Sequence, residues 1–124
     1  MDPFTSCDFQ LLERLYERFN ARDMEALLAT LHASVAWANG WEGGYVHGHA
    51  DVRTYWTRQW AVIDPQLKPL SFRAGPDGQI AVKVHQSVHD CNAKLLSDKV
   101  VEHGFHIEGG LIRRFDILPP QRGQ

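Results

Sequence analysis

The 124-residue sequence predicts a single α+β domain in which a curved antiparallel sheet wraps, as a cone, around three N-terminal helices. Three observations lead to this prediction. Helical periodicity is confined to the first half of the chain, the second half alternates with the two-residue period of strands, and short turns join these strands into hairpins. Helices followed by consecutive hairpin-linked strands are typical of a sheet with helices on one face.

The first half of the chain predicts the three helices. Apolar side chains recur at helical spacing over 6–20, and Asp23 is a suitable N-cap for a second helix over 24–32. The short link between the two predicts a helical hairpin with a shared apolar side. A third helix is predicted over 50–62, where the following Asp64-Pro65 ends it.

The strands follow from alternation and turn residues. A short strand is predicted over 35–39, before a glycine-rich loop, and an irregular or edge strand over 67–74, because it contains Pro69. Longer strands are predicted over 80–90, 95–107 and 111–118. Alternation gives these strands an inward face that includes Val84, Gln86, Val88, Val101, His103 and Phe105.

Length and composition fit one domain spanning residues 1–124. Residues 1–5 are expected to be disordered or foreign to the native chain, and residues 119–124 to form a tail. The net charge of −2 and the lack of a basic run give no reason to expect nucleic acid. No apolar stretch could cross a bilayer, so no membrane partner is expected, and Cys7 and Cys91 lack a metal or redox spacing, which favours a cytoplasmic setting.

Three segments occur in order and at suitable spacing: FNARDMEAL at 19–27, VHGHADV at 46–52 and FHIEGGLI at 105–112. Together they resemble the nuclear transport factor 2-like superfamily, which includes polyketide cyclases and steroid isomerases. The resemblance extends over most of the chain. It implies a cystatin-like α+β roll with space between sheet and helices for a small apolar organic ligand.

The steroid isomerases of this superfamily have a catalytic aspartate near the end of the first strand, and the resemblance puts Asn39 there. An amide cannot abstract a proton at neutral pH, so the familiar isomerase reaction is not expected. The same resemblance puts His103 at the position of a second functional acid. It puts the oxyanion-hole tyrosine on or beside Leu15, next to Tyr16.

Limonene-type epoxide hydrolases, also in the superfamily, hold a water with an aromatic hydroxyl and an asparagine, and a carboxylate activates it. Trp37 and Asn39 lie at the matching alternation, and Asp116 on the last strand is the corresponding carboxylate. Trp37 lacks the hydroxyl, however, and no Arg-x-Asp pair occurs around residues 84–86. The match to this chemistry is therefore incomplete.

The candidate site has a polar centre and an aromatic wall. Asn39, His103 and Asp116 are the candidate catalytic residues, with Asp116 orienting His103 from the adjacent strand. The alternatives are structural: a loop-bonding asparagine, a core histidine, and a surface carboxylate beside Arg113 or Arg114. The expected ligand-binding residues are Tyr16, Trp37, Trp56, Trp60, Gln86 and Phe105.

The seven histidines form no recognisable zinc spacing, so neither a metal nor another cofactor is expected. His85 and His89 are predicted on the outer face of the sheet, together with Val100. An exposed apolar sheet face needs cover, so a homodimer through this face is expected.

Three functions remain open, and with them the question of whether the chain is an enzyme. The first is an isomerase, cyclase or hydrolase that acts without metal on a small apolar or cyclic organic compound. The second is a non-catalytic domain that uses the same pocket to bind such a ligand. The third is a structural homodimer with a collapsed core.

Overall fold

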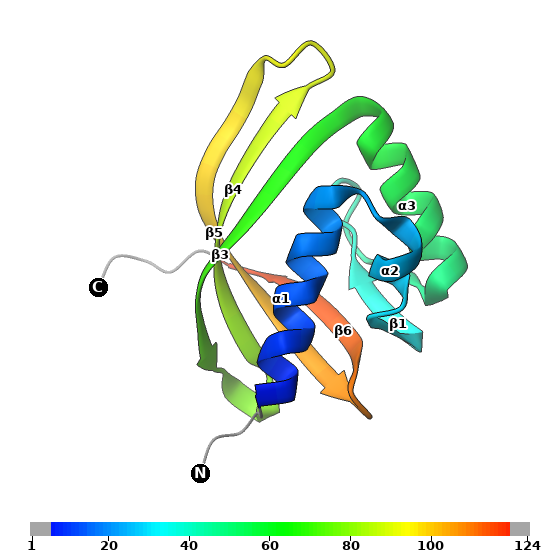
Figure 1. Cartoon of the computed structure of the whole chain (residues 1–124), viewed down its shortest axis with the longest axis vertical. Coiled ribbons are helices and arrows are strands. Elements are labelled where there is room, and N and C mark those ends of the chain that lie inside the picture. The colour runs from blue at the N-terminus through cyan, green and yellow to red at the C-terminus, as the bar shows by residue number, and fades with distance from the viewer. Residues whose placement is uncertain (1–5, 120–124) are drawn as a thin grey trace.

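The computed structural model of the protein describes residues 6–119, and it consists of a curved, open sheet with helices against its inner side (Figure 1). The helices are α1 (Ser6–Ala21), α2 (Met24–Leu28), α3 (Gly48–Val62) and the short 3-10 helix η1 (Pro76–Gly78). The strands are β1 (Leu31–Ala38), β2 (Tyr45–His47), β3 (Ile63–Ala74), β4 (Ile80–Asp90), β5 (Leu95–Glu108) and β6 (Leu111–Leu118). The predicted α+β cone is confirmed, whereas segment 1–5 and most of the tail lie outside the described residues.

The sheet has the order β2-β1-β6-β5-β4-β3. All neighbouring pairs are antiparallel except β1 and β6, which run parallel with Trp37 beside Phe115. The sheet is therefore mixed, where an antiparallel one was predicted. Hairpin connections oblige the strands from β3 to β6 to alternate in direction, but no hairpin joins β1 to β6.

Several element boundaries differ from the prediction, among them the start of β1 at Leu31, and tertiary contacts explain two others. The second helix ends at Leu28, since the backbone of Thr30 already accepts a hydrogen bond from Ile112 of β6. Strand β3 begins at Ile63, directly after α3, and tolerates its prolines because it is the edge strand of the sheet. The predicted N-cap is confirmed: the Asp23 side chain accepts a hydrogen bond from the backbone of Ala26.

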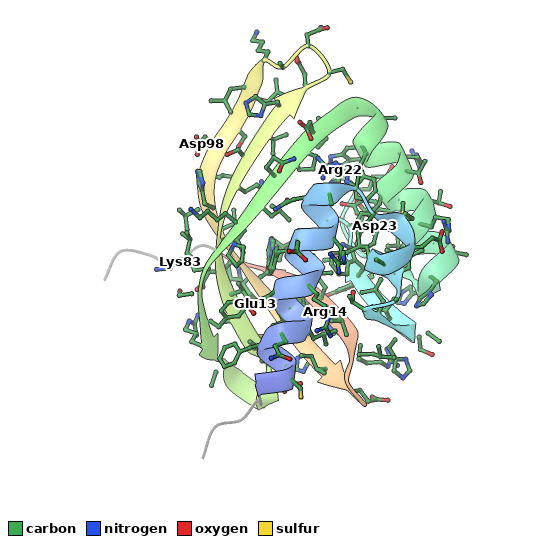
Figure 2. The ribbon with its side chains drawn as sticks, viewed as in Figure 1. Glu13, Arg14, Arg22, Asp23, Lys83 and Asp98 are labelled. Atoms are coloured by element: carbon green, nitrogen blue, oxygen red, sulfur yellow. The ribbon has the colours of Figure 1, made fainter. Side chains whose placement is uncertain are left out.

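The core lies between the inner face of the sheet and the helices. Leu12 of α1, Trp56 of α3, Val82 of β4 and Phe105 of β5 are fully buried. Lys83, next to Val82 in sequence, projects from the side of the sheet away from the helices (Figure 2). The predicted alternation of β4 is thus confirmed. Among residues 6–119 no helix combines the length and apolar character needed to cross a bilayer.

The hairpin between β5 and β6 shows how turn chemistry sets the register of the site. Gly109 and Gly110 both have positive φ, 61° and 80°, which suits the tight turns that match strand twist. This turn brings His103 opposite Ile117 and Gly104 opposite Asp116. Consequently His103 and Asp116 lie on opposite faces of the sheet.

Candidate functional site

A cleft of about 420 Å³ lies between the inner face of the sheet and α3. This volume is within the range of small-molecule sites. Aromatic and aliphatic side chains from α1, β1, α3 and all four strands from β3 to β6 make up most of its lining. Apart from Trp and Tyr, the polar side chains of the lining are Gln59, Gln86, Ser97, Lys99 and His103.

The aromatic wall of the cleft is built on the parallel pair of strands. Trp37 of β1 stacks on Phe115 of β6, with ring centroids 4.0 Å apart. Trp56 of α3 meets Trp37 edge-to-face at 5.0 Å, a preferred geometry for aromatic pairs. These three side chains line the cleft and are almost entirely buried, so they form a rigid apolar surface.

Trp60 and Phe105 support this wall from behind. Trp60 stacks on Trp56 at 5.9 Å and lies under the guanidinium of Arg22, outside the lining of the cleft. Phe105 is fully buried against Tyr16 and borders only a void of about 20 Å³. Although both were expected to bind the ligand, the structure puts them one layer further in.

His103 of β5, which lines the cleft, pairs with Tyr16 of α1, which is not part of the cleft lining. The Tyr16 hydroxyl lies 2.8 Å from His103 Nδ1, and both side chains are buried. The two rings are nearly parallel, and Phe115 packs edge-on against the imidazole at 4.8 Å. Tyr16 and His103 are thus brought together, a contact that sequence reasoning did not anticipate. Tyr16, which was expected to bind the ligand, lies outside the cleft lining and borders an open hollow over β3.

Burial sets the protonation of this pair. Desolvation lowers the pKa of His103 from 6.5 to about 3 and raises the pKa of Tyr16 well above its usual 10. Both side chains are therefore neutral near neutral pH. A neutral imidazole has one N–H donor and one acceptor nitrogen.

The direction of the hydrogen bond follows from satisfying the Tyr16 hydroxyl. If Nδ1 carried the proton, the buried Tyr16 O–H would have no acceptor among the described residues, which is costly. Tyr16 therefore donates to Nδ1, and Nε2 of His103 carries the N–H.

Nε2 is available to a ligand. In the described part of the chain, Trp60 Nε1 is the one fully enclosed side-chain nitrogen or oxygen without a hydrogen bond. His103 Nε2 has no partner there either, yet it is not fully enclosed. His103 lines the cleft, and Nε2 is its ring nitrogen without a hydrogen-bond partner among the described residues.

Asn39 takes part in the loop after β1 and not in the Tyr16–His103 pair. Its side-chain oxygen accepts hydrogen bonds from the backbone of Trp41 and Glu42, at 2.9 and 3.0 Å. The structural alternative for Asn39 is the one observed, and its side chain is not part of the cleft lining. The alternation of β1 does not extend to Asn39 because the strand ends at Ala38.

Asp116 lies on the outer face and does not orient His103. It interacts with the Tyr45 hydroxyl and accepts a hydrogen bond from Arg114 Nε at 2.9 Å. Although partial desolvation acts in the opposite direction, these hydrogen bonds lower the pKa of the Asp116 carboxyl. The predicted Asp116–His103 pair is wrong for a simple reason: Asp116 stands opposite Gly104, one position away from the register needed.

Gln86 lines the cleft as predicted, and Lys99 stands opposite it on β5. Lys99 and Ser97 were missed, although the alternation through Val101 and His103 continues to both. Phe115 was missed because the parallel pairing of β1 and β6 leaves no local signal in the sequence. Trp41, 45% exposed, also lines the cleft from the glycine-rich loop.

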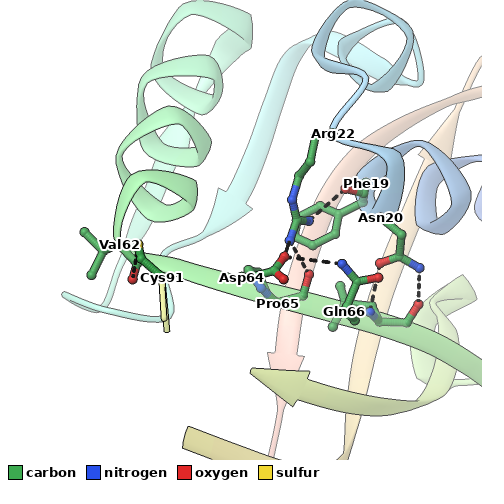
Figure 3. A network of polar contacts seen from close by, with 9 residues as sticks. Phe19, Asn20, Arg22, Val62, Asp64, Pro65, Gln66 and Cys91 are labelled. Carbon is green, nitrogen blue, oxygen red and sulfur yellow. Dashed lines mark hydrogen bonds and ion pairs between the residues drawn. The ribbon is translucent and has the colours of Figure 1, made fainter. Parts of the chain in front are cut away.

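A clasp of polar contacts holds edge strand β3 against the end of α1 (Figure 3). The Asn20 side chain donates to the carbonyl of Leu67 at 2.7 Å and accepts from its N–H at 2.9 Å. Arg22 donates to the carbonyl of Pro65 at 2.7 Å and pairs with Asp64. Pro65 and Leu67 line the cleft, so the clasp fixes this side of it.

A second hollow, of about 560 Å³, lies over β3 between α1 and β4. It is open, and its lining mixes the acids Glu13 and Glu17 with Lys68 and His85. It lacks the aromatic wall of the cleft. Across residues 6–119 no three His, Cys, Asp or Glu side chains are grouped so that they could hold a metal ion.

Comparison with known proteins agrees with this architecture. Residues 12–115 match the SnoaL-like domain. The chain belongs to the SnoaL-like domain family. The resemblance to the nuclear transport factor 2-like superfamily, to which this family belongs, is thereby confirmed. No curated protein matches this SnoaL-like chain.

Solved structures with the same fold include proteins from several bacteria. An NTF2-like protein of unknown function from Burkholderia pseudomallei has a TM-score of 0.77 and 26% identity, with 90% of this chain and 88% of that one covered. A putative polyketide cyclase from Sinorhizobium meliloti has a TM-score of 0.74 and 18% identity, covering 88% and 94%. A Mycobacterium tuberculosis protein in complex with estradiol-17beta-hemisuccinate has a TM-score of 0.76 and 14% identity, covering 90% and 92%.

Proposed function

We propose that this SnoaL-like domain binds a small cyclic organic molecule in the cleft, with an oxygen atom of the ligand hydrogen-bonded to Nε2 of His103. The observation that carries the proposal is the neutral Tyr16–His103 pair, which offers one N–H donor within an aromatic enclosure. Trp37, Trp56 and Phe115 would hold the flat face of such a ligand. The estradiol derivative bound by the M. tuberculosis structure is a molecule of this general kind.

Binding is favoured over proton-transfer catalysis by the composition of the lining. Neither Asp nor Glu occurs among the described residues that line the cleft. His103, with a pKa of about 3, is too weak a base to abstract a proton from carbon near pH 7. Its N–H can still polarise a carbonyl group, as neutral histidines do elsewhere.

A matched pair of ligands tests the role of His103. We expect 2-acetylnaphthalene, which has a carbonyl oxygen, to bind the wild-type protein about fivefold more tightly than 2-ethylnaphthalene, which keeps the ring and the two-carbon chain but has no oxygen. His103→Leu should abolish this preference while retaining the binding of 2-ethylnaphthalene. Calorimetric titration gives both affinities, and circular dichroism checks that the variant is folded.

Two results would contradict the proposal. One is failure of both compounds to bind the folded wild-type protein. The other is a carbonyl preference that survives in His103→Leu. Should that variant not fold, His103→Gln offers a second test. The glutamine oxygen can accept the hydrogen bond from Tyr16, while its NH₂ group replaces the imidazole N–H as the donor to the ligand.

A second candidate function is non-metal catalysis on a carbonyl compound, an isomerase, cyclase or hydrolase reaction. The observation that favours it is again the His103 donor, which could stabilise developing negative charge on a ligand oxygen. The base that removes a proton in such a reaction would have to come from the substrate or from solvent. Turnover of a bound carbonyl compound by the wild type, but not by His103→Leu, would support this function over binding alone.

We also propose that two copies pair through the outer face of the sheet, where Val100 is 54% exposed. Val100→Lys should then lower the molecular mass measured by sedimentation, and a wild-type monomer would contradict the pairing.

Cys7 and Cys91 are both free and exposed, which supports a reducing, cytoplasmic location. Recovery of the native protein from another cell fraction would contradict that location.

A further inference from the structure

The cleft carries one charged side chain. Among the described residues that line it, Lys99 is the only Lys, Arg, Asp or Glu. No ion-pair partner for Lys99 is found within residues 6–119. The nearest acid in sequence, Asp98, pairs with His85 on the other side of the sheet, away from the helices (Figure 2). Lys99 is exposed, and it is the one charged side chain of the cleft lining that the described residues leave without an ion-pair partner.

The neighbours of Lys99 are suited to a polar end of a ligand. Gln86 stands directly opposite on β4, and Ser97 precedes Lys99 on the same face of β5. An amide, a hydroxyl and an ammonium group therefore gather on neighbouring strands at one part of the cleft lining. Together they supply several hydrogen-bond donors, a set that matches the oxygens of a carboxylate.

The spacing of the two polar positions defines the length of the ligand. His103 and Lys99 lie on the same face of β5, and the pairing of β5 with β4 is regular from His103 to Ser97. With a rise of about 3.3 Å per residue, their Cα atoms are about 13 Å apart. Between them on the same face of β5 lies Val101, whose side chain is apolar.

From these observations we infer that the ligand is an elongated cyclic carboxylate. Its carbonyl or hydroxyl oxygen meets His103 at one end, and its carboxylate meets Lys99 at the other. This inference rests on the proposed function, because it names the chemical class of the ligand of the same cleft. The lack of acids in the lining means that an anion encounters attraction from Lys99 without nearby repulsion.

The test compares an acid with its neutral ester. The probes are 6-acetyl-2-naphthoate and methyl 6-acetyl-2-naphthoate, titrated by calorimetry into wild type, Lys99→Met and Lys83→Met. Methionine keeps the length of the side chain and removes the charge. Lys83 is exposed on the outer face of neighbouring β4, so Lys83→Met is the matched control for net charge.

We expect Lys99→Met to bind the acid about 10-fold more weakly than wild type, with the ester unaffected. Lys83→Met should bind both as wild type does. Added salt should weaken binding of the acid to wild type, because it screens the attraction between Lys99 and the carboxylate. It should have little effect in Lys99→Met, which lacks that attraction.

The outcomes separate the two proposals. If acid and ester bind wild type equally and Lys99→Met changes neither, the carboxylate inference is overturned while the binding function stands. Equal losses of acid affinity in Lys99→Met and Lys83→Met would also overturn it, since net charge alone would then explain the effect. If neither probe binds the folded wild-type protein, both proposals fail.

Discussion

The two faces of strand β5 differ in how their charges are matched. On the outer face, Asp98 pairs with His85, and Glu102 pairs with Arg73 at 3.2 Å. On the inner face, Lys99 has no ionic partner among the described residues, and His103 is held neutral by burial. The outer face thus satisfies its charges within the protein, whereas the inner face leaves one cation and one N–H donor for something else.

This difference shows that the two-residue period of a strand can place acidic side chains on one face of a sheet and hydrogen-bond donors on the other. A carboxylate one position along, such as Asp116 opposite Gly104, lies on the wrong side of the sheet to assist His103. Asp98, Glu102 and Asp116 therefore lie on the outer face of the sheet. The cleft retains the means to bind an oxygen-bearing ligand without the carboxylate base that steroid isomerases use.

The largest expected loss of stability comes from a substitution in the aromatic wall on the inner face of the sheet. Trp56→Ala removes a fully buried ring that contacts Trp37 and Trp60, and should lower the free energy of unfolding by about 3–5 kcal/mol. Trp41→Ala, at a ring 45% exposed in the loop, should lower it by less than about 1 kcal/mol. Urea unfolding monitored by circular dichroism measures both. Equal losses would show that Trp56 is not part of a packed wall.

A somewhat smaller effect should appear when the pH is lowered. The pKa of His103 is 6.5 when unfolded and about 3 when folded, so between these values the unfolded chain binds the extra proton. Stability should therefore fall as the pH drops from 7 to 5, by about 2 kcal/mol from this residue.

His103→Gln should remove this part of the pH dependence, and His47→Gln, at an exposed position, should keep it. The free energy of unfolding measured in urea at pH 7, 6 and 5 gives the three slopes. If His103→Gln and wild type lose stability in parallel, His103 is not buried in its neutral form.

The smallest change in stability is expected from a substitution on the outer face of the sheet. Asp116→Asn removes an ion pair with Arg114 at a partly exposed site, and should change the free energy of unfolding by less than about 1 kcal/mol. The affinity for 2-acetylnaphthalene should stay at the wild-type value, because Asp116 does not line the cleft. A tenfold loss of affinity in titration calorimetry would mean that the outer face takes part in binding.

The fold was predictable from the sequence because its signals are local. Helical periodicity, the Asp23 cap and the alternation of β4 each lie within one element, and the structure confirms them. The parallel pairing of β1 with β6 was not predictable, since it joins segments with most of the chain between them. Phe115 could not be assigned to the cleft without it.

The site was predictable in part, for the same reason. Gln86 and His103 follow from alternation inside long strands, and Lys99 could have been found by extending it. Asn39 and Asp116 failed as site residues because their positions depend on where a strand ends and on the register across a hairpin. The contact between Tyr16 and His103 needs the packing of α1 on the sheet, which periodicity alone does not define.

The central claim is that the aromatic cleft with its His103 donor is the binding site. Nuclear magnetic resonance of the ¹⁵N-labelled protein, titrated with 2-acetylnaphthalene, tests it most directly. The account predicts that the largest shifts occur at the indole N–H of Trp56 and Trp37 and at the imidazole of His103. Shifts confined to the other hollow, at Glu13, Lys68 and His85, would contradict it.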